Sequence, residues 1–303
     1  MDRRSFFKKS IGASIAVGGY FATSKYSELL AFAPTPYDLV AIKGGEPDIM
    51  FNKGIAALGG MKAFVKKGQK VVVKPNIGWD TAPEYAGCTN PKLISRIIEH
   101  CYDAGAKEVY VLDHTCDDWE KCYAHSGIEN AAKHAKGKVA PAHTENYYQD
   151  VSIPKGKMLK SAKEHELILS ADVFINVPIL KNHSGSSLTI SMKNLMGNVW
   201  DRGYWHGADL HQCIADFATY RKPDLNIVDA YYVMKANGPR GTSTKDVVTM
   251  KAQLISTDIV AVDTAAAKLF GMNPNDIRHI KIAADMKIGR KDLDKLNIKR
   301  ITV

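Results

Sequence analysis

The stretch VFINVPILKNHSGSSLTISMKNLMG, residues 173–197, joins a strongly apolar run to two copies of the dipeptide Lys-Asn. Its first five residues are mostly β-branched and predict a strand over 173–177. Lys181-Asn182 and Lys193-Asn194 then follow among residues that are otherwise mainly small or apolar. Buried ammonium groups need partners, so this stretch bears on both the fold and the function.

Short β-branched runs alternate with helical patterns along most of the chain. Apolar residues recur at helical spacing over 91–104, 118–135, 209–220, 259–270 and 277–286. We expect Thr257 or Asp258 to cap the 259–270 helix, and Gly271 to end it. Strands are predicted over 39–43, 70–74, 108–112, 173–177, 225–228, 251–255 and 299–303. This alternation indicates an α/β fold, with a mostly parallel central sheet flanked by helices on both faces.

Residues 137–161 interrupt the alternation with two prolines, two glycines and several lysines. This segment predicts a small inserted loop or β elaboration, or a lid. The sequence shows no internal repeat and no low-complexity tract, and its 45% hydrophobic content suits a large core. We therefore expect residues 34–303 to form one α/β domain.

The N-terminus has the three parts of an export signal. The paired Arg3 and Arg4 precede Phe-Phe-Lys, an apolar run spans residues 11–22, and Ala31-Phe32-Ala33 forms a small-x-small cleavage site. The paired arginines resemble a bacterial twin-arginine signal, which implies export by the twin-arginine machinery to the periplasm or another extracytoplasmic space. The alternative is an amphipathic N-terminal helix of the mature fold. The apolar run is too short to span a bilayer, so we expect no stable membrane span in the mature protein.

The net charge of +9 does not indicate nucleic-acid binding. Residues 1–33 hold five basic and two acidic side chains, so +3 of the total belongs to the export signal. The remainder is spread along the chain without a run of five basic residues. We therefore expect no nucleic-acid partner.

Polar side chains follow four predicted strands at the point where each strand ends. These groups are Lys74 and Asn76, then Asp113, His114 and Thr115, then Lys181, Asn182 and His183, and finally Asp229. Each of them alone is more often a turn former or a helix cap. Ligands of open parallel sheets bind outside the carboxyl ends of the strands, so together these groups predict a binding cleft.

The turn 184–187 is expected to open a buried helix over 188–196. Free N–H groups at the start of such a helix suit an anion. Lys193 lies within this helix, so its ammonium should meet a carboxylate such as Asp229 or a bound anion, unless it extends to solvent. Asn182 and Asn194 can hold a lysine or a ligand carboxylate in place.

Two glycine-bounded loops add further candidates. The loop 201–207, DRGYWHG, contains His206 and is either a gate over the cleft or an ordinary surface loop. The turn 237–241, NGPRG, presents Arg240, which can clamp a carboxylate or phosphate.

The chain has five cysteines, an odd number that leaves at least one thiol unpaired. Three readings stay open for the cysteines near residue 116: a Cys116–Cys122 disulfide, unpaired thiols, or a metal ion or iron-sulfur cluster. The last reading uses the ligand types found at Cys101, Cys116, Cys122 and His114.

An ordered series of motifs runs along the chain: KPNIGW (74–79), Pro178 with Lys181 and His183, MKNLMG (192–197), His206, IVDA (227–230), NGPRG (237–241) and STDIVAVDTAAAKLFG (256–271). This series resembles the bacterial and archaeal family called domain of unknown function 362 (DUF362). The resemblance covers roughly residues 37–289, and the family name supplies no reaction. Some members carry an appended ferredoxin-type domain, which implies iron-sulfur redox chemistry, but this chain lacks the Cys-x2-Cys-x2-Cys run of that domain.

The sequence therefore predicts an exported α/β protein whose cationic cleft binds a small anionic molecule, and we expect an enzyme of unspecified reaction. His183, His206 and Lys193 are the catalytic candidates, because imidazole or a desolvated lysine can exchange a proton near neutral pH. Asp113 and Asp229 would orient these groups or hold a divalent ion. The two alternatives are a metal-bearing redox protein and a non-catalytic anion-binding protein. The ligand-binding candidates are Lys74, Asn76, Lys181, Asn182, Asn194 and Arg240.

Overall fold

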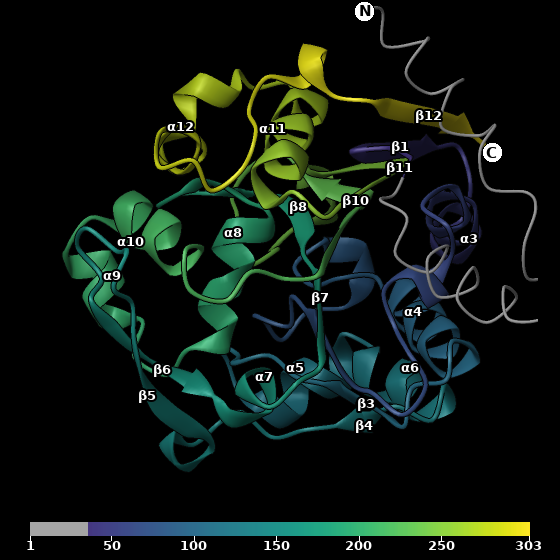
Figure 1. Cartoon of the computed structure of the whole chain (residues 1–303), viewed down its shortest axis with the longest axis horizontal. Helices are drawn as coiled ribbons and strands as arrows, with labels where there is room; N and C mark the ends of the chain where they lie inside the picture. Colours follow the sequence, from purple (N-terminus) through teal and green to yellow (C-terminus); the bar gives the residue numbers. More distant parts are fainter. Residues whose placement is uncertain (1–35) are drawn as a thin grey trace, which may run out of the picture. The chain divides into compact units, whose positions relative to one another are not determined.

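The computed structural model describes residues 36–303, which form an α/β fold around a ten-stranded sheet (Figure 1). The export signal predicted over 1–33 lies outside the described residues. The main path of the sheet runs β12-β1-β11-β10-β7-β2-β3-β4, and β8 and β9 join it through β10. Six strand pairs are parallel and three are antiparallel, which confirms a mostly parallel sheet. The strands are β1 (Leu39–Lys43), β2 (Lys70–Pro75), β3 (Glu108–Val111), β4 (Lys138–Val139), β7 (Val173–Val177), β8 (Ile179–His183), β9 (Ser187–Thr189), β10 (Leu225–Met234), β11 (Val247–Ser256) and β12 (Ile298–Thr302).

Both faces of the sheet are covered by helices, as predicted. Successive side chains of a strand point to opposite faces, so Val72 of β2 and Phe174 of β7 enter one apolar core, whereas Val71 and Ile175 enter the other. Helices α8 (Ser191–Asn194), α10 (Leu210–Phe217), α11 (Ile259–Phe270) and α12 (Arg278–Asp285) cover the first face. Helices α3 (Pro47–Ala57), α4 (Pro91–Asp103), α5 (Trp119–His125) and α6 (Ile128–His134) cover the second.

The helix ends follow the local sequence signals. Asp258 caps α11 by accepting from the N–H groups of Val260 and Ala261, and Gly271 ends the helix with a φ of 94°. The predicted 118–135 helix is instead two helices, because Gly127 takes a φ of 72° between α5 and α6. Helix α3 was not predicted.

The helix predicted over 188–196 begins three residues later than expected. The turn 184–187 joins β8 to β9, and α8 begins at Ser191 and continues as a 3-10 turn, Leu195–Asn198. The Asp263 carboxylate on α11 accepts from the N–H groups of Ser191 at 2.7 Å and Met192 at 3.0 Å. A side chain of the protein therefore occupies the position that we expected for an anionic ligand.

The inserted segment forms a small antiparallel pair, β5 (Tyr148–Ser152) and β6 (Ser161–His165), followed by the short helix α7 (Glu166–Leu169). This confirms the predicted β elaboration. A role as a lid stays a prediction. Across residues 36–303, no helix has the length and apolar character needed to cross a membrane.

Candidate functional site

A small polar cavity of about 60 Å³ lies at the carboxyl ends of β2 and β3, beside β8 and α8. Nine of the predicted site residues line it: Lys74, Asn76, Asp113, His114, Cys116, Lys181, His183, Lys193 and Asn194. Gly78, Trp79, Thr189, Met196, Gly197, Arg202 and Pro239 complete the wall. Residues from positions 74 to 239 thus converge at one edge of the sheet, around a cavity that we call the cleft.

A buried ion pair forms the floor of the cleft. The Lys74 ammonium lies 2.8 Å from Asp113 Oδ1, and both residues are almost fully buried. Asp113 Oδ2 accepts from the backbone N–H of Ile77 at 2.6 Å. Burial lowers the pKa of Lys74 and the neighbouring Asp113 opposes that change. Because each charge has a partner, this pair can remain ionised without solvent.

Two asparagines connect this pair to a second buried lysine. Asn194 Oδ1 accepts from Lys74 Nζ at 3.0 Å and from Asn76 Nδ2 at 2.9 Å. Asn76 Oδ1 in turn accepts from Lys181 Nζ at 3.0 Å, and Lys181 also donates to the Gly87 carbonyl at 2.5 Å. The two Lys-Asn dipeptides therefore contribute Lys181 and Asn194 to one network. Burial lowers the pKa of Lys181 to about 8, since amide and carbonyl oxygens are its partners here.

Lys193 also lines the cleft, and within residues 36–303 its ammonium has no hydrogen bond or ion pair. Burial, together with the nearby cations Arg202, Lys181 and Lys74, lowers its pKa to about 8. The expected pairing with Asp229 is wrong. Asp229 accepts instead from the backbone N–H groups of Asn90 at 2.7 Å and Tyr231 at 3.0 Å, so it holds the start of α4 and not the cleft.

His183 stands at the end of β8 with its ring partly buried. Its Nδ1 accepts from the backbone N–H of Gly185 at 3.0 Å and of Ser186 at 3.3 Å. Burial, and then Lys193 and Lys181, lower the pKa of His183 to about 3. The ring is therefore neutral at physiological pH.

Arg202, which our sequence analysis did not assign to the site, supplies a fourth cation. It precedes the short helix α9 (Gly203–Gly207) and donates to the carbonyls of His114 at 3.0 Å and Thr115 at 2.9 Å. His114 Nδ1 lies 2.9 Å from the Val199 carbonyl, and burial lowers the pKa of His114 to about 4. In the sequence, Arg202 is recognisable only as an arginine in a glycine-bounded loop. That pattern alone does not indicate that its side chain reaches the end of a strand.

Three other candidates lie at the rim or outside the cleft. Asn182 Oδ1 accepts from the Gly238 N–H at 3.0 Å, and His206 lies exposed on α9. Partial burial and the nearby Lys193 and Arg202 lower the pKa of His206. Arg240 is paired with Asp117 at 3.0 Å, so its guanidinium already has an anionic partner.

The predicted metal ligands do not converge. Cys101 and Cys122 are buried in the apolar core on the α4 side of the sheet, whereas Cys116 is exposed at the cleft near His114. All five cysteines are free, so the structure does not contain the Cys116–Cys122 disulfide. Over the described part of the chain, no group of three or more His, Cys, Asp or Glu side chains is placed to hold a metal ion.

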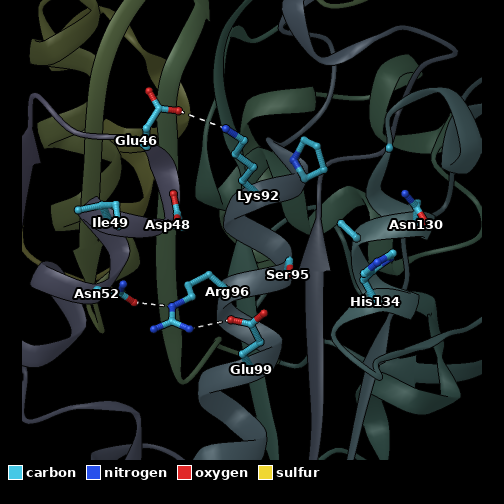
Figure 2. A pocket seen from close by; sticks show the side chains of 13 residues that line it. Glu46, Asp48, Ile49, Asn52, Lys92, Ser95, Arg96, Glu99, Asn130 and His134 are labelled. Carbon is cyan, nitrogen blue, oxygen red and sulfur yellow. Dashed lines mark hydrogen bonds and ion pairs between the residues drawn. The ribbon is translucent and has the colours of Figure 1, made fainter.

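A larger groove lies elsewhere, between α3, α4 and α6, with a volume of about 880 Å³ (Figure 2). Its cations already have partners. Lys92 lies 3.4 Å from Glu46, and Arg96 lies 2.7 Å from Glu99. This groove therefore lacks the unpaired positive charge that marks the cleft.

One comparison, with a family model, agrees with the motif pattern. A family model described as domain of unknown function (DUF362) matches residues 71–268. A protein of Synechocystis sp. described as thylakoid-associated is 26% identical over 240 residues, which cover 77% of this chain and 72% of that protein. The lactate racemase apoprotein from Thermoanaerobacterium thermosaccharolyticum shares 10% sequence identity, with a TM-score of 0.43 over 76% of this chain. This chain spans 56% of that racemase, a little over half its length.

Proposed function

The chain belongs to the DUF362 family, and we propose that it binds a small anionic molecule in the cleft and exchanges a proton with it. The observation that supports binding is an excess of positive charge. Within residues 36–303, Lys74, Lys181, Lys193 and Arg202 line the cavity against a single carboxylate, Asp113. At an effective dielectric constant near 20, two like charges about 5 Å apart repel by roughly 3 kcal/mol. An anion bound there would offset that repulsion.

The volume of the cavity limits what enters it. A space of about 60 Å³ accommodates a group the size of a carboxylate or a phosphate. A larger ligand would place its anionic end in the cleft and leave the remainder outside.

Lys193 is the residue that we propose for proton exchange. The ammonium groups of Lys74 and Lys181 already contact Asp113, asparagine and carbonyl oxygens. Lys193 has no such partner among the described residues, and a pKa of about 8 allows it to bind and release a proton near neutral pH. His206, exposed at the rim, is the second candidate for this role.

Calorimetric titration with inorganic phosphate, sulfate and acetate tests the binding. We expect at least one of them to bind at low ionic strength, with affinity that falls as pH rises above 8 and Lys193 and Lys181 lose their protons. Lys193→Met should abolish this binding, whereas the exposed Lys53→Met should not change it. If no anion binds, or if both variants behave alike, the assignment of the cleft is wrong.

Turnover separates an enzyme from a non-catalytic anion-binding protein. A metabolite panel that raises the melting temperature, followed by mass spectrometry of each stabilising compound, would reveal time-dependent conversion by an enzyme. A binding protein would leave every compound unchanged. The metal-bearing redox alternative receives no support from the positions of Cys101 and Cys122.

We also propose that the protein is exported by the twin-arginine pathway. The support is the sequence of the first 33 residues, in which Arg3 and Arg4 precede the apolar run. Replacing both arginines by lysine should hold the full chain in the cytoplasm during cell fractionation. An unchanged distribution of the double variant would refute this route.

A further inference from the structure

We infer that His183 is fixed as a neutral imidazole with its proton on Nε2, and that the cleft selects anions without an ammonium group. This inference rests on the proposed function, because it names the chemical class that the same cleft takes. It also changes the role of His183 from a proton-transfer group to a hydrogen-bond donor.

His183 Nδ1 takes part in two hydrogen bonds. Both donors are backbone N–H groups, Gly185 at 3.0 Å and Ser186 at 3.3 Å, so Nδ1 must accept and cannot carry a proton. A neutral imidazole has one N–H, which therefore lies on Nε2. The β8–β9 turn thus sets the tautomer, in the way that a backbone partner on one ring nitrogen commonly fixes the other.

The charged neighbours of His183 oppose a second proton. Burial is the largest cause of the lowered pKa of His183, and the nearby Lys193, Lys181 and His206 lower it further. The buried His279 also interacts electrostatically with this ring, and it too disfavours an imidazolium. At neutral pH the ring therefore stays neutral, because its Nδ1 does not accept a proton.

The remaining polar groups of the cleft are also accounted for. The side-chain oxygens of Asp113, Asn76 and Asn194 already accept from Lys74, Lys181 or neighbouring N–H groups. Among the groups left over, the Lys193 ammonium and the His183 Nε2–H donate, and the Thr189 hydroxyl can do either. His114 Nε2 can accept, because the Nδ1–H of that ring donates to the Val199 carbonyl. A ligand oxyanion finds donors there.

A ligand ammonium would meet no free carboxylate in the described cleft and would be repelled by the excess positive charge. Matched pairs of small acids that differ only by one ammonium group therefore test this selectivity. We expect acetate to bind at least tenfold more tightly than glycine, and methylphosphonate more tightly than aminomethylphosphonate.

Two measurements test the inference on the full chain. Long-range ¹H–¹⁵N spectra of the ligand-free protein report the tautomer, and we expect a protonated Nε2 and an unprotonated Nδ1 from pH 5 to pH 8. Titration with acetate and glycine reports selectivity. For acetate, His183→Gln should retain affinity within a few-fold, because its amide N–H stands near the Nε2 position, whereas His183→Leu should lose tenfold or more.

The outcomes separate this inference from the proposed function. A proton on Nδ1, or titration of His183 near its ordinary pKa, overturns the assigned tautomer whether or not any anion binds. Equal binding of acetate and glycine overturns the selectivity while leaving anion binding in place. If none of the four acids binds but the tautomer is as expected, anion binding and its selectivity fail together and the assignment of His183 stands.

Discussion

Replacing Lys193 by methionine should stabilise the ligand-free protein while removing its affinity for anions. A lysine whose pKa falls from 10.5 to about 8 on folding destabilises the folded state by about 3 kcal/mol at pH 7. The side chain is only partly buried, so we expect a net gain nearer to 2 kcal/mol for Lys193→Met. For a domain of this size that gain raises the melting temperature by about 4 to 8 °C.

The sign of the pH dependence follows from the lowered pKa. The unfolded chain binds this proton more tightly than the folded chain, so the penalty is complete below pH 8 and disappears as pH rises toward 10.5. The advantage of Lys193→Met should therefore be largest at pH 7 and small at pH 10.5. Differential scanning calorimetry in low-salt amine buffers, with chloride as the counter-ion, measures both values without supplying a carboxylate, phosphate or sulfonate.

Two matched variants make the result specific. Lys74→Met leaves the buried Asp113 carboxylate without its cation and should destabilise the protein by about 3 to 5 kcal/mol. The exposed Lys53→Met should change little. Should Lys193→Met lower the melting temperature, or raise it equally at pH 7 and pH 10.5, the account of an unpaired ammonium in the cleft is refuted.

Three further substitutions test other features. Gly197→Ala would place a Cβ 1.8 Å from Asp113 Oδ1 and 2.6 Å from Lys74 Nζ, so calorimetry should show a loss of about 3 kcal/mol or more together with lost acetate binding. Gly78→Ala, whose Cβ would lie 3.7 Å from Asn76 Oδ1, is the tolerated control. Burial raises the pKa of Glu164 to about 8, so its stabilising contribution is complete below pH 4.5 and is lost as pH rises through 8. Urea unfolding of Glu164→Gln should therefore show a gain of up to about 4 kcal/mol at pH 9 and almost none at pH 4.5. Asp229→Asn should lower the free energy of unfolding in urea by about 1 to 2 kcal/mol without weakening acetate binding. The reason is that Asp229 accepts hydrogen bonds from backbone N–H groups and does not line the cleft.

The sequence predicted seven of the ten strands, because these strands are locally encoded, whereas β4, β8 and β9 were not predicted. The valine-rich run of β2 is buried along almost its whole length, and a segment of that composition has few other stable conformations. The convergence of Lys74, Asp113 and Lys181 also followed from local signals, since parallel strands bring their carboxyl ends to one edge.

Features that depend on long-range contacts were not predictable in the same way. The start of α8 is fixed by Asp263, a carboxylate 72 positions after Ser191. The apolar pattern over 188–196 suits one helix equally well, and nothing within that segment reveals the hairpin that interrupts it. Arg202 joins the cleft through carbonyl groups of the β3 end, which a single sequence does not link to a loop 88 residues later.

The two asparagines that connect Lys74 to Lys181 limit which substitutions this cleft can tolerate. Each of the four side chains Lys74, Asn194, Asn76 and Lys181 hydrogen-bonds to the next, so the loss of one leaves its neighbour unsatisfied in the interior. Effects of single replacements within this quartet should therefore not sum, and double-mutant cycles would reveal the coupling. A lineage that altered one member would need to alter others with it, so the four residues should be inherited or replaced as a set.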